Sequence, residues 1–311
     1  MTNPAALPAS ETRNALLAGV ACYTVWGFLP LLFMALAGLG FSSPEILAHR
    51  ALWSVIFAGV IVLIAGQGAQ VRKVLASPRT LGWLALSTTL IVVNWGAYVW
   101  ATTHHHTIEA SLGYYINPLL NMVAGLFLFR EKIDRWGWVA IGAAAIGVVI
   151  QTVALGRAPW LSLLIALSFA AYAVIRKRVQ ADAQTGLFIE CLLMLPFGAA
   201  ALVWLTQTGQ SVGFSSPLHW GWAVSSGLIT VLPLVLFSWS ARRLPLSIIG
   251  FLQFLAPTIQ FGIGVVSGEP LTPLRIASFA FIWAGAAIFV GAMLARRRAE
   301  QRAVQATITA V

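Results

Sequence analysis

Residues 80–102 read TLGWLALSTTLIVVNWGAYVWAT, a run without a single Asp, Glu, Lys or Arg. A helix needs about 20 mostly apolar residues to span a bilayer, so this run is long enough to cross one. Arg72, Lys73 and Arg79 precede the run, whereas no Lys or Arg separates it from Glu109. Because cytoplasmic loops retain Lys and Arg, the run is predicted to enter the membrane from the cytoplasm.

The rest of the chain repeats this pattern of long apolar runs and short gaps. We expect helices at residues 13–37, 44–65, 80–102, 109–129, 134–155, 159–176, 185–206, 218–240, 246–267 and 273–295. Helices are expected rather than barrel strands, because the runs are apolar at nearly every position, whereas a barrel strand alternates with period two. The predicted fold is therefore an all-α polytopic membrane protein with ten transmembrane helices.

Composition excludes several classes of protein. The chain is 59% hydrophobic and 9% charged, against roughly 25% charged residues in soluble domains. Ten helices with short loops use nearly all 311 residues, which leaves no room for a soluble domain. A nucleic-acid-binding protein gathers Lys and Arg on one folded surface, whereas here they punctuate apolar runs. The expected partner is therefore the lipid bilayer, and no nucleic acid is expected.

The basic residues predict the orientation. Sixteen of the nineteen Lys and Arg fall in alternate gaps, and the exceptions are Arg50, Arg157 and Arg275. Both termini are therefore predicted to be cytoplasmic. The tail at residues 296–311 is expected to be cytoplasmic and to fray beyond the last helix.

An internal similarity links the two halves of the chain, residues 13–155 and 159–295. Asn117-Pro118 and Ala256-Pro257 occupy comparable places, five predicted helices apart. Because five is odd, a second copy of a five-helix unit must enter the membrane from the opposite side. The prediction is two inverted repeats, a plan that many secondary transporters use, with a site near the midplane between the repeats.

Charges inside predicted helices are costly and therefore candidates for function. Arg50 and Glu190 lie in corresponding helices of the two halves but at opposite depths, too far apart for a direct salt bridge. We expect Arg50 to pair with Glu45 or Glu109. A structural pair or snorkelling to the interface stays open for Arg50, and a buried pair stays open for Glu190.

Polar side chains within the predicted helices suggest a binding site. Asn94, Trp95 and Tyr98 lie within about one turn, which suits an amphipathic organic substrate, although interhelical hydrogen bonds are an alternative. The helix at 109–129 is polar on more than one face, so it should lie centrally. Its polar residues include Ser111, Tyr114, Tyr115 and Asn117. In the helix that would correspond to it, Gln253 and Gln260 are seven apart and are expected on one face.

Three further sequence patterns bear on metal binding, helix packing and catalysis. His104-His105-His106 cannot point one way on a helix, so a polar turn is favoured over a metal site and no metal is expected. The segment 142–147, GAAAIG, suggests close helix packing or a homodimer contact. No phosphate loop, catalytic triad or zinc spacing is present, so neither an enzyme nor a cofactor is expected.

Several stretches resemble the RarD proteins, within the EamA group of the drug/metabolite transporter superfamily. These stretches are residues 109–119 (EASLGYYINPL), 45–54, 172–177, 186–190 and 252–258. One departure is Phe254, where the family often has Tyr. The resemblance implies a ten-helix transporter with two inverted EamA repeats in the bacterial inner membrane. It also implies a cavity lined by the first, third, fourth, sixth, eighth and ninth helices, with Arg50 and Glu190 further from its centre.

The leading hypothesis is an alternating-access carrier that exports a small organic solute, drug or metabolite. Its expected cavity lining is Asn94, Trp95, Tyr98, Ser111, Tyr115, Asn117, Gln253 and Gln260. Gating or structural roles are expected for Arg50, Glu109, Glu190, Pro118 and Pro257, with Glu109 at the outer gate. Proton coupling through embedded carboxylates is a further hypothesis. A channel and a non-transporting scaffold or sensor remain alternatives.

Overall fold

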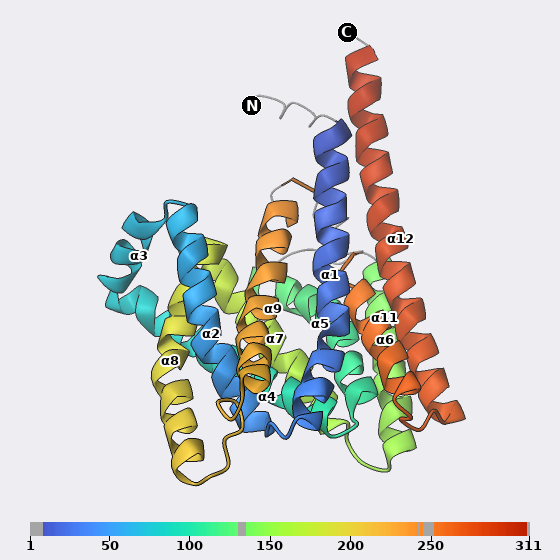
Figure 1. The fold of residues 1–311 in the computed structure, drawn as a ribbon. Helices are drawn as coiled ribbons and strands as arrows, with labels where there is room; N and C mark the ends of the chain where they lie inside the picture. Colours follow the sequence, from blue (N-terminus) through green and yellow to red (C-terminus); the bar gives the residue numbers. More distant parts are fainter. Residues whose placement is uncertain (1–8, 130–134, 242, 245–251, 310–311) are drawn as a thin grey trace.

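A computed structural model describes residues 9–129, 135–241, 243–244 and 252–309, and these ranges are helical without strands. The helices (Figure 1) are α1 (Ala9–Gly38), α2 (Ser43–Ile64), α3 (Gly68–Leu75), α4 (Pro78–Thr103), α5 (Thr107–Phe129), α6 (Arg135–Leu155), α7 (Trp160–Arg178), α8 (Ala183–Gln207), α9 (Pro217–Ala241), α11 (Leu255–Val266) and α12 (Pro273–Thr309). Each apolar range expected to be a membrane helix overlaps one of them, and α3 is additional.

The helices have the length and surface of membrane spans. Among the described residues, α1, α2, α4, α6, α8, α9 and α12 each contain a segment long and apolar enough to cross a membrane. The apolar helices at Trp160–Arg176 and Leu255–Val266 are shorter. Large apolar side chains point outward from the bundle, including Ile64 at 82% and Phe197 at 78% exposure. Such a surface is suited to lipid, so the chain is a multi-pass membrane protein.

Local capping residues explain where two of the spans begin. The hydroxyl of Ser42 accepts a hydrogen bond from the Glu45 amide at 3.3 Å and starts α2. Ser77 does the same for α4, accepting from the amide of Thr80 at 3.4 Å. Each cap is followed by a proline in the first helical turn, where the missing N–H removes no helix hydrogen bond.

Two expectations at the ends of the helices are wrong. The tail at 296–311 was expected to fray, yet α12 continues without interruption to Thr309. This tail is rich in Ala, Arg, Glu and Gln, which favour helix even in water. The helix α3 lies in a gap expected to be loop. Val71 and Val74 are buried while Arg72 and Lys73 are exposed, so α3 is a short amphipathic helix lying beside α4 and α8.

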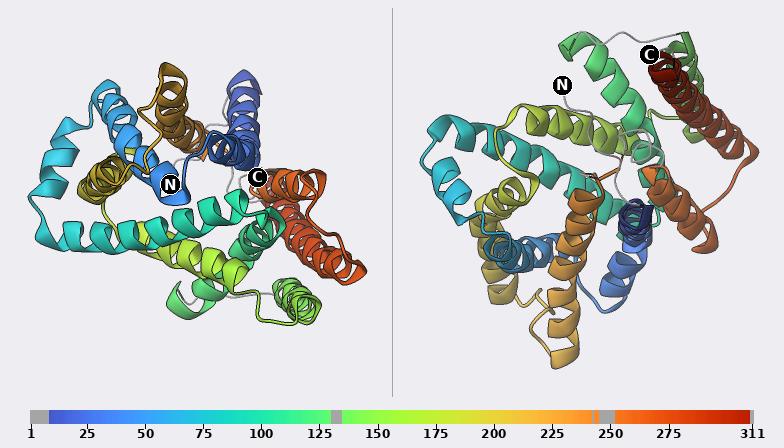
Figure 2. Two further views of the ribbon diagram at one scale, coloured as in Figure 1. Left: turned by 60° about the horizontal axis from the view of Figure 1, so that its bottom comes forward. Right: turned by 90° about the horizontal axis from the view of Figure 1, so that it is seen from above.

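The helices form a central group flanked by two pairs. The helix α2 packs along α8 on one side, and α6 packs along α12 on the opposite side (Figures 1 and 2). The other long helices lie between these pairs, with α1 on α9 and α11, and α7 on α4 and α5. This arrangement puts segments from both halves of the chain next to each other throughout the bundle.

Glycines set the close approach of α6 and α12. A Cβ atom on Gly147 would lie 2.8 Å from the carbonyl oxygen of Ser278. A Cβ atom on Gly285 would lie 2.9 Å from the carbonyl oxygen of Ala140. Each helix therefore contributes one glycine and one facing backbone carbonyl to the contact. The segment expected to serve packing or a dimer thus packs within the chain at Gly147.

Loop contacts define the two ends of the bundle. At the end that we call outer, Ser43 hydrogen-bonds Thr103 at 2.9 Å, and the Ser162 hydroxyl donates to the Glu109 carbonyl oxygen at 2.6 Å. At the end that we call inner, Arg243 binds Glu11 at 3.0 Å. Because Glu11 is at the start of α1 and Ser162 at the start of α7, these two helices begin at opposite ends.

Apolar packing joins many helices in the outer half of the centre. One cluster of buried side chains there joins α1, α2, α4, α5, α7 and α9, and it includes Phe33, Tyr98 and Ile165. In the inner half, the described residues form separate clusters. One lies around Tyr23 between α1, α9 and α11, and another around Leu84 between α2, α3, α4 and α8.

Candidate functional site

A buried arginine lies where α2 faces the central helices α1, α4 and α9, closer to the centre than the family resemblance implied. Arg50 of α2 is 3% exposed, and its Nε donates a hydrogen bond to the Thr230 hydroxyl of α9 at 3.1 Å. Its guanidinium carbon lies 4.3 Å from the ring centroid of Trp95 and 5.0 Å from that of Phe33. Within the described part of the chain, Nη1 has no hydrogen-bond partner. Side chains from α1, α2, α4 and α9, and so from both halves, meet at this charge.

The contacts of Arg50 are two aromatic rings and one hydroxyl group, none of which carries a negative charge. A desolvated cation–π contact contributes up to about 2 kcal/mol, and a hydrogen bond from a charged group contributes about 1.5–3 kcal/mol. Burying an ion costs several kcal/mol even after the protein relaxes, and a missing partner leaves that cost uncompensated. Such a charge inside a membrane protein makes Arg50 a candidate functional residue.

The prediction that Arg50 pairs with Glu45 or Glu109 is wrong. Glu45 was expected because it is five residues away on nearly the same helix face, and Glu109 because it is at the outer end of the predicted helix 109–129. Instead the Glu45 carboxylate accepts hydrogen bonds from Ser211, Val212 and Gly213, in the loop before α9. Sequence spacing placed Glu45 close to Arg50 on one helix, but the loop amides lie where the carboxylate points.

A polar and aromatic network extends from Arg50 along α4. Tyr98 is 2% exposed, and its ring packs edge-on against Phe33 and Tyr114, with centroids 6.0 and 5.4 Å apart. The Tyr114 hydroxyl donates to Asn94 Oδ1 at 3.0 Å, and Asn94 Nδ2 donates to the Ile165 carbonyl at 2.8 Å. Asn94 therefore makes the interhelical hydrogen bonds that were the alternative to substrate contact.

A second charged cluster surrounds Glu190 of α8. Its carboxylate accepts hydrogen bonds from the hydroxyls of Ser87 on α4 and Tyr172 on α7. Arg176 Nε lies 3.7 Å from Glu190 Oε1, and both side chains are largely buried. Glu190 therefore links α8 to α4 and α7, away from the Arg50 cluster.

The outer end is tied together by three buried carboxylates, of which Glu45 is one. Glu109 Oε2 lies 3.5 Å from His106 Nδ1 and 3.6 Å from Arg157 Nη2. The Glu269 carboxylate accepts hydrogen bonds from the backbone amides of Thr107 and Ile108, the first two residues of α5. A carboxylate at a helix N-terminus accepts hydrogen bonds from amides that have no partner in the helix, and its charge interacts favourably with the helix dipole.

The remaining expected lining residues are divided between other contacts. Tyr115 hydrogen-bonds Thr258 of α11, and its ring faces Phe279 and Trp283 of α12. Ser111 donates to the carbonyl of Ile108 in its own helix. These side chains lie within the packing of α5 against α11 and α12.

The three amide side chains expected to line the cavity differ in their positions and hydrogen-bond partners. Asn117 is fully buried, and its amide atoms find no partner among the described residues. Gln260 donates to the Trp26 carbonyl oxygen of α1 at 3.1 Å. Gln253 and Gln260 were expected on one face of one helix, which is wrong, because Gln253 lies in a turn that precedes α11.

The two prolines are not in equivalent places. Pro118 lies well inside α5, whereas Pro257 is the third residue of α11. A proline in the first turn removes no helix hydrogen bond. The expectation that both prolines weaken helix interiors is therefore wrong for Pro257, because α11 begins later than its sequence pattern indicates.

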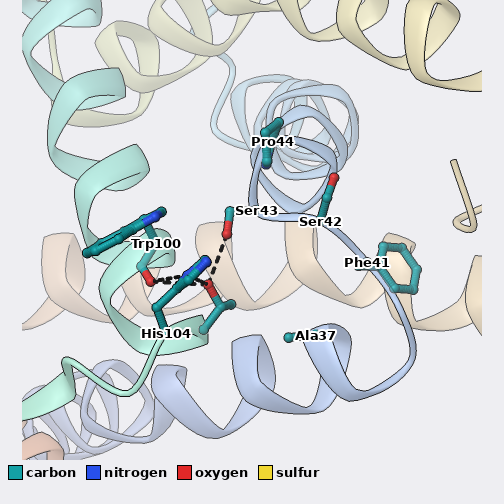
Figure 3. Close-up of a pocket in the computed structure, with 8 residues that line it drawn as sticks. Ala37, Phe41, Ser42, Ser43, Pro44, Trp100 and His104 are labelled. Carbon is teal, nitrogen blue, oxygen red and sulfur yellow. Dashed lines mark hydrogen bonds between the residues drawn. The ribbon is translucent and has the colours of Figure 1, made fainter. Parts of the chain in front are cut away.

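A pocket of about 450 Å³ lies at the outer end between α1, α2 and α4. Figure 3 shows Trp100 and His104 on one wall, with Ser43 and Pro44 opposite them. His104 and His106 both stack on the Trp100 ring, with centroids 4.8 and 5.3 Å away.

In the described ranges, no group of three His, Cys, Asp or Glu side chains could hold a metal ion.

The sequence did not identify several residues of these clusters. Thr230 and Phe33 stand in apolar runs without any distinguishing pattern. Arg176 was counted among the basic residues and falls in the stretch 172–177 that resembles the RarD proteins, but no role was expected for it. Tyr172 precedes it by four residues and so shares its helix face, which was a signal for the Glu190 cluster.

Comparisons with known proteins agree with this architecture. The EamA-like transporter family matches residues 13–153 and 157–291, that is, twice. Protein RarD from Streptomyces exfoliatus is 38% identical over 94% of this chain and 93% of its own. A Vibrio cholerae serotype O1 protein named as an uncharacterized transporter is 40% identical over 90% of this chain and 92% of its own.

One solved crystal structure has a similar fold. It superposes with a TM-score of 0.56 at 21% identity, covering 91% of this chain and 97% of that one. The double family match, the RarD relatives and the membrane-spanning helices all point the same way. This chain belongs to the EamA-like transporter family and is a membrane transporter of the RarD type.

Proposed function

We propose that this protein is an alternating-access carrier for a small organic solute, drug or metabolite. The observation that carries the proposal is the Arg50 cluster, where a costly buried charge stands at the contact between the two halves of the chain. Secondary transporters built from repeats bind their cargo at such a junction. Trp95 and Tyr98 are proposed to contact the cargo with Arg50. Ser111, Tyr115, Asn117, Gln253 and Gln260 stay predictions.

The two matched halves are proposed to be inverted five-helix repeats with ten membrane crossings. Helix packing supports this, because contacts recur in matched pairs. The packing of α5 on α7 corresponds to that of α11 on α1, and α1 on α9 corresponds to α7 on α4. The opposite starts of α1 and α7 support the inversion. Glycine and carbonyl contacts between α6 and α12 follow the same symmetry.

We propose that the described conformation is closed at the outer end. The apolar cluster that joins six helices supports this, together with the ties made by Glu45, Glu109 and Glu269. Separation of these contacts would open the outer side, and Glu109 is a proposed outer-gate residue. The Glu190 cluster would be the corresponding tie between α8, α4 and α7 nearer the inner end.

The inner end is proposed to face the cytoplasm of a bacterium, with both chain termini there. The distribution of Lys and Arg supports this orientation. Cysteines placed singly at Gln67 and Thr208 provide the test, since they lie at opposite ends of the bundle. An impermeant thiol reagent added to intact cells should label position 208 and spare position 67, and the reverse pattern would invert the proposed orientation.

Transport itself is tested in proteoliposomes containing the purified protein and a panel of radiolabelled metabolites and drugs. A carrier gives saturable flux and counterflow, in which internal unlabelled solute accelerates exchange of labelled solute. Single-channel currents without saturation would favour a channel. Absence of flux from folded protein would favour a scaffold or sensor.

Export, proton coupling and a homodimer are separate proposals. Export is supported by the resemblance to the drug/metabolite superfamily and is tested by uptake into inside-out vesicles. Proton coupling is supported by the buried carboxylates of Glu109 and Glu190. A flux that is unchanged by an imposed pH gradient and by the substitutions Glu109→Gln and Glu190→Gln would contradict proton coupling. The homodimer is tested by the molar mass of the detergent-solubilised protein.

A further inference from the structure

We infer that the transported solute is an organic anion and that Arg50 binds its carboxylate at the centre of the bundle. This inference rests on the proposed carrier function and adds the chemical class of the cargo. It depends on three features of the structure, which are a missing counterion, unused hydrogen-bond donors and the aromatic surface around them.

Arg50 lacks a counterion within the described part of the protein. The carboxylates whose side chains are described all bind elsewhere, and they are Glu11, Glu45, Glu109, Asp182, Glu190 and Glu269. An arginine keeps its charge in proteins. The centre of the bundle therefore carries an uncompensated positive charge that an anionic cargo would neutralise.

The unused donors match a carboxylate. Nη1 of Arg50 carries two N–H groups and has no partner among the described residues, and the same holds for the Tyr98 hydroxyl. Tyr98 lies next to this charge, because the Phe33 ring contacts both the Arg50 guanidinium and the Tyr98 ring. Arginine binds a carboxylate through parallel hydrogen bonds from two guanidinium nitrogens, of which Nη1 can supply one, and a tyrosine hydroxyl can donate a further bond.

The charge balance favours a monocarboxylate over a phosphate ester. Arg176, the other largely buried arginine among the described side chains, is already paired with Glu190. A phosphate carries up to two negative charges, and a single guanidinium leaves one of them without a partner. The Trp95 and Phe33 rings beside Arg50 suit an apolar or aromatic body attached to the carboxylate.

Binding at Arg50 is linked to movement of the two halves. Arg50 is buried in this conformation, so the cargo reaches it only after the surrounding helices separate. Among the described residues, the guanidinium donates its hydrogen bond to Thr230 of α9, in the other half of the chain. An anion that replaces Thr230 would change the contact between α2 and α9, which is how cargo binding would favour opening.

The test uses full-length purified protein and three probes that share a phenyl ring, namely 3-phenylpropionate, 3-phenylpropionamide and phenyl phosphate. Binding is measured for wild type, Arg50→Met, Arg50→Lys and the control Arg275→Met, which removes an arginine at the outer end. We expect 3-phenylpropionate to bind wild type and the control more tightly than the other probes do. Arg50→Met should weaken its binding by about tenfold or more, a loss of about 1.4 kcal/mol or more by the affinity relation. The affinity of Arg50→Lys for 3-phenylpropionate should lie between those of wild type and Arg50→Met, because lysine keeps the charge but lacks the planar guanidinium.

A measurement without ligand guards against misfolding. Because the guanidinium has no counterion among the described residues, Arg50→Met should unfold at the same temperature as wild type or higher. A marked fall in its unfolding temperature would overturn the inference, since Arg50 would then be a structural group. So would equal binding of the carboxylate and the amide, tighter binding of phenyl phosphate, or the absence of any Arg50-dependent carboxylate binding.

Flux measurements separate this inference from the proposed function. A protein that transports neutral solutes equally well with Arg50→Met is a carrier whose cargo is not an anion. A protein that binds carboxylates through Arg50 but moves none of them across a membrane contradicts the carrier function and leaves the anion site in place.

Discussion

Replacing Gly147 by alanine tests the packing on which the two-repeat arrangement depends. The new Cβ would lie 2.6 Å from Ile282 Cγ1 and 2.8 Å from the carbonyl oxygen of Ser278. The isoleucine side chain can rotate away, but the carbonyl belongs to the backbone of α12 and moves only with that helix. Overpacking of this kind costs about 1–3 kcal/mol.

Gly142→Ala on the same helix is the matched control. A Cβ at Gly142 meets no atom within 4 Å, yet this substitution has the same effect on helix propensity, about 1 kcal/mol in favour of alanine. The difference in unfolding free energy between the two variants therefore isolates the clash at about 1–3 kcal/mol. Gly285→Ala should resemble Gly147→Ala, because its Cβ would lie 2.9 Å from the Ala140 carbonyl.

The assay is thermal unfolding of the purified protein in detergent, followed by circular dichroism. Gly147→Ala should unfold at least about 2 °C below Gly142→Ala, on the usual relation between stability and melting temperature. Equal unfolding temperatures would refute the close approach of α6 and α12. A change of molar mass in Gly142→Ala alone would instead indicate that this helix face forms a contact between copies.

Three other substitutions test single contacts. Glu190→Gln removes the charge facing Arg176 and should lower both the unfolding temperature and the transport turnover. Its control, Glu11→Gln, breaks a partly exposed ion pair and should reduce the unfolding free energy by less than about 1 kcal/mol. Similar losses of stability in the two variants would contradict the buried contact between Glu190 and Arg176. Glu269→Ala leaves the first two amides of α5 without their acceptor, so hydrogen exchange there should accelerate while exchange in α9 stays constant. Tyr115→Phe removes the hydroxyl bonded to α11 and should cost about 1 kcal/mol in chemical unfolding, and an unchanged midpoint would show that this bond is not stabilising.

The apolar helices were predictable because each depends on its own sequence. A run such as residues 80–102 must satisfy its backbone hydrogen bonds internally wherever it lies in the membrane. Wrong expectations arose where a helix end depends on weaker signals. The late start of α11 places Gln253 outside the helix and Pro257 in its first turn. The length of the apolar run gives no sign of this start, because the run continues through residues 246–267.

Side-chain partners were less predictable than helices. Arg50 was identified as an unusual charge from its position alone, yet its hydrogen-bond partner Thr230 is 180 residues away. The expected partners were those nearest in the chain, and both are bound elsewhere. Hydrophobic periodicity indicates which residues are buried but contains no information about which helix lies opposite.

The sequence by itself determined the class of protein, the apolar runs and the alternation of basic and uncharged gaps. These properties follow from transfer of single segments into a bilayer, which depends on local composition. Only the tertiary structure decided that α2 turns Arg50 toward α1, α4 and α9 and that Glu45 binds a distant loop. The physical reason is that a buried charge depends on the groups within a few ångströms of it, and packing between helices from both halves brings those groups together.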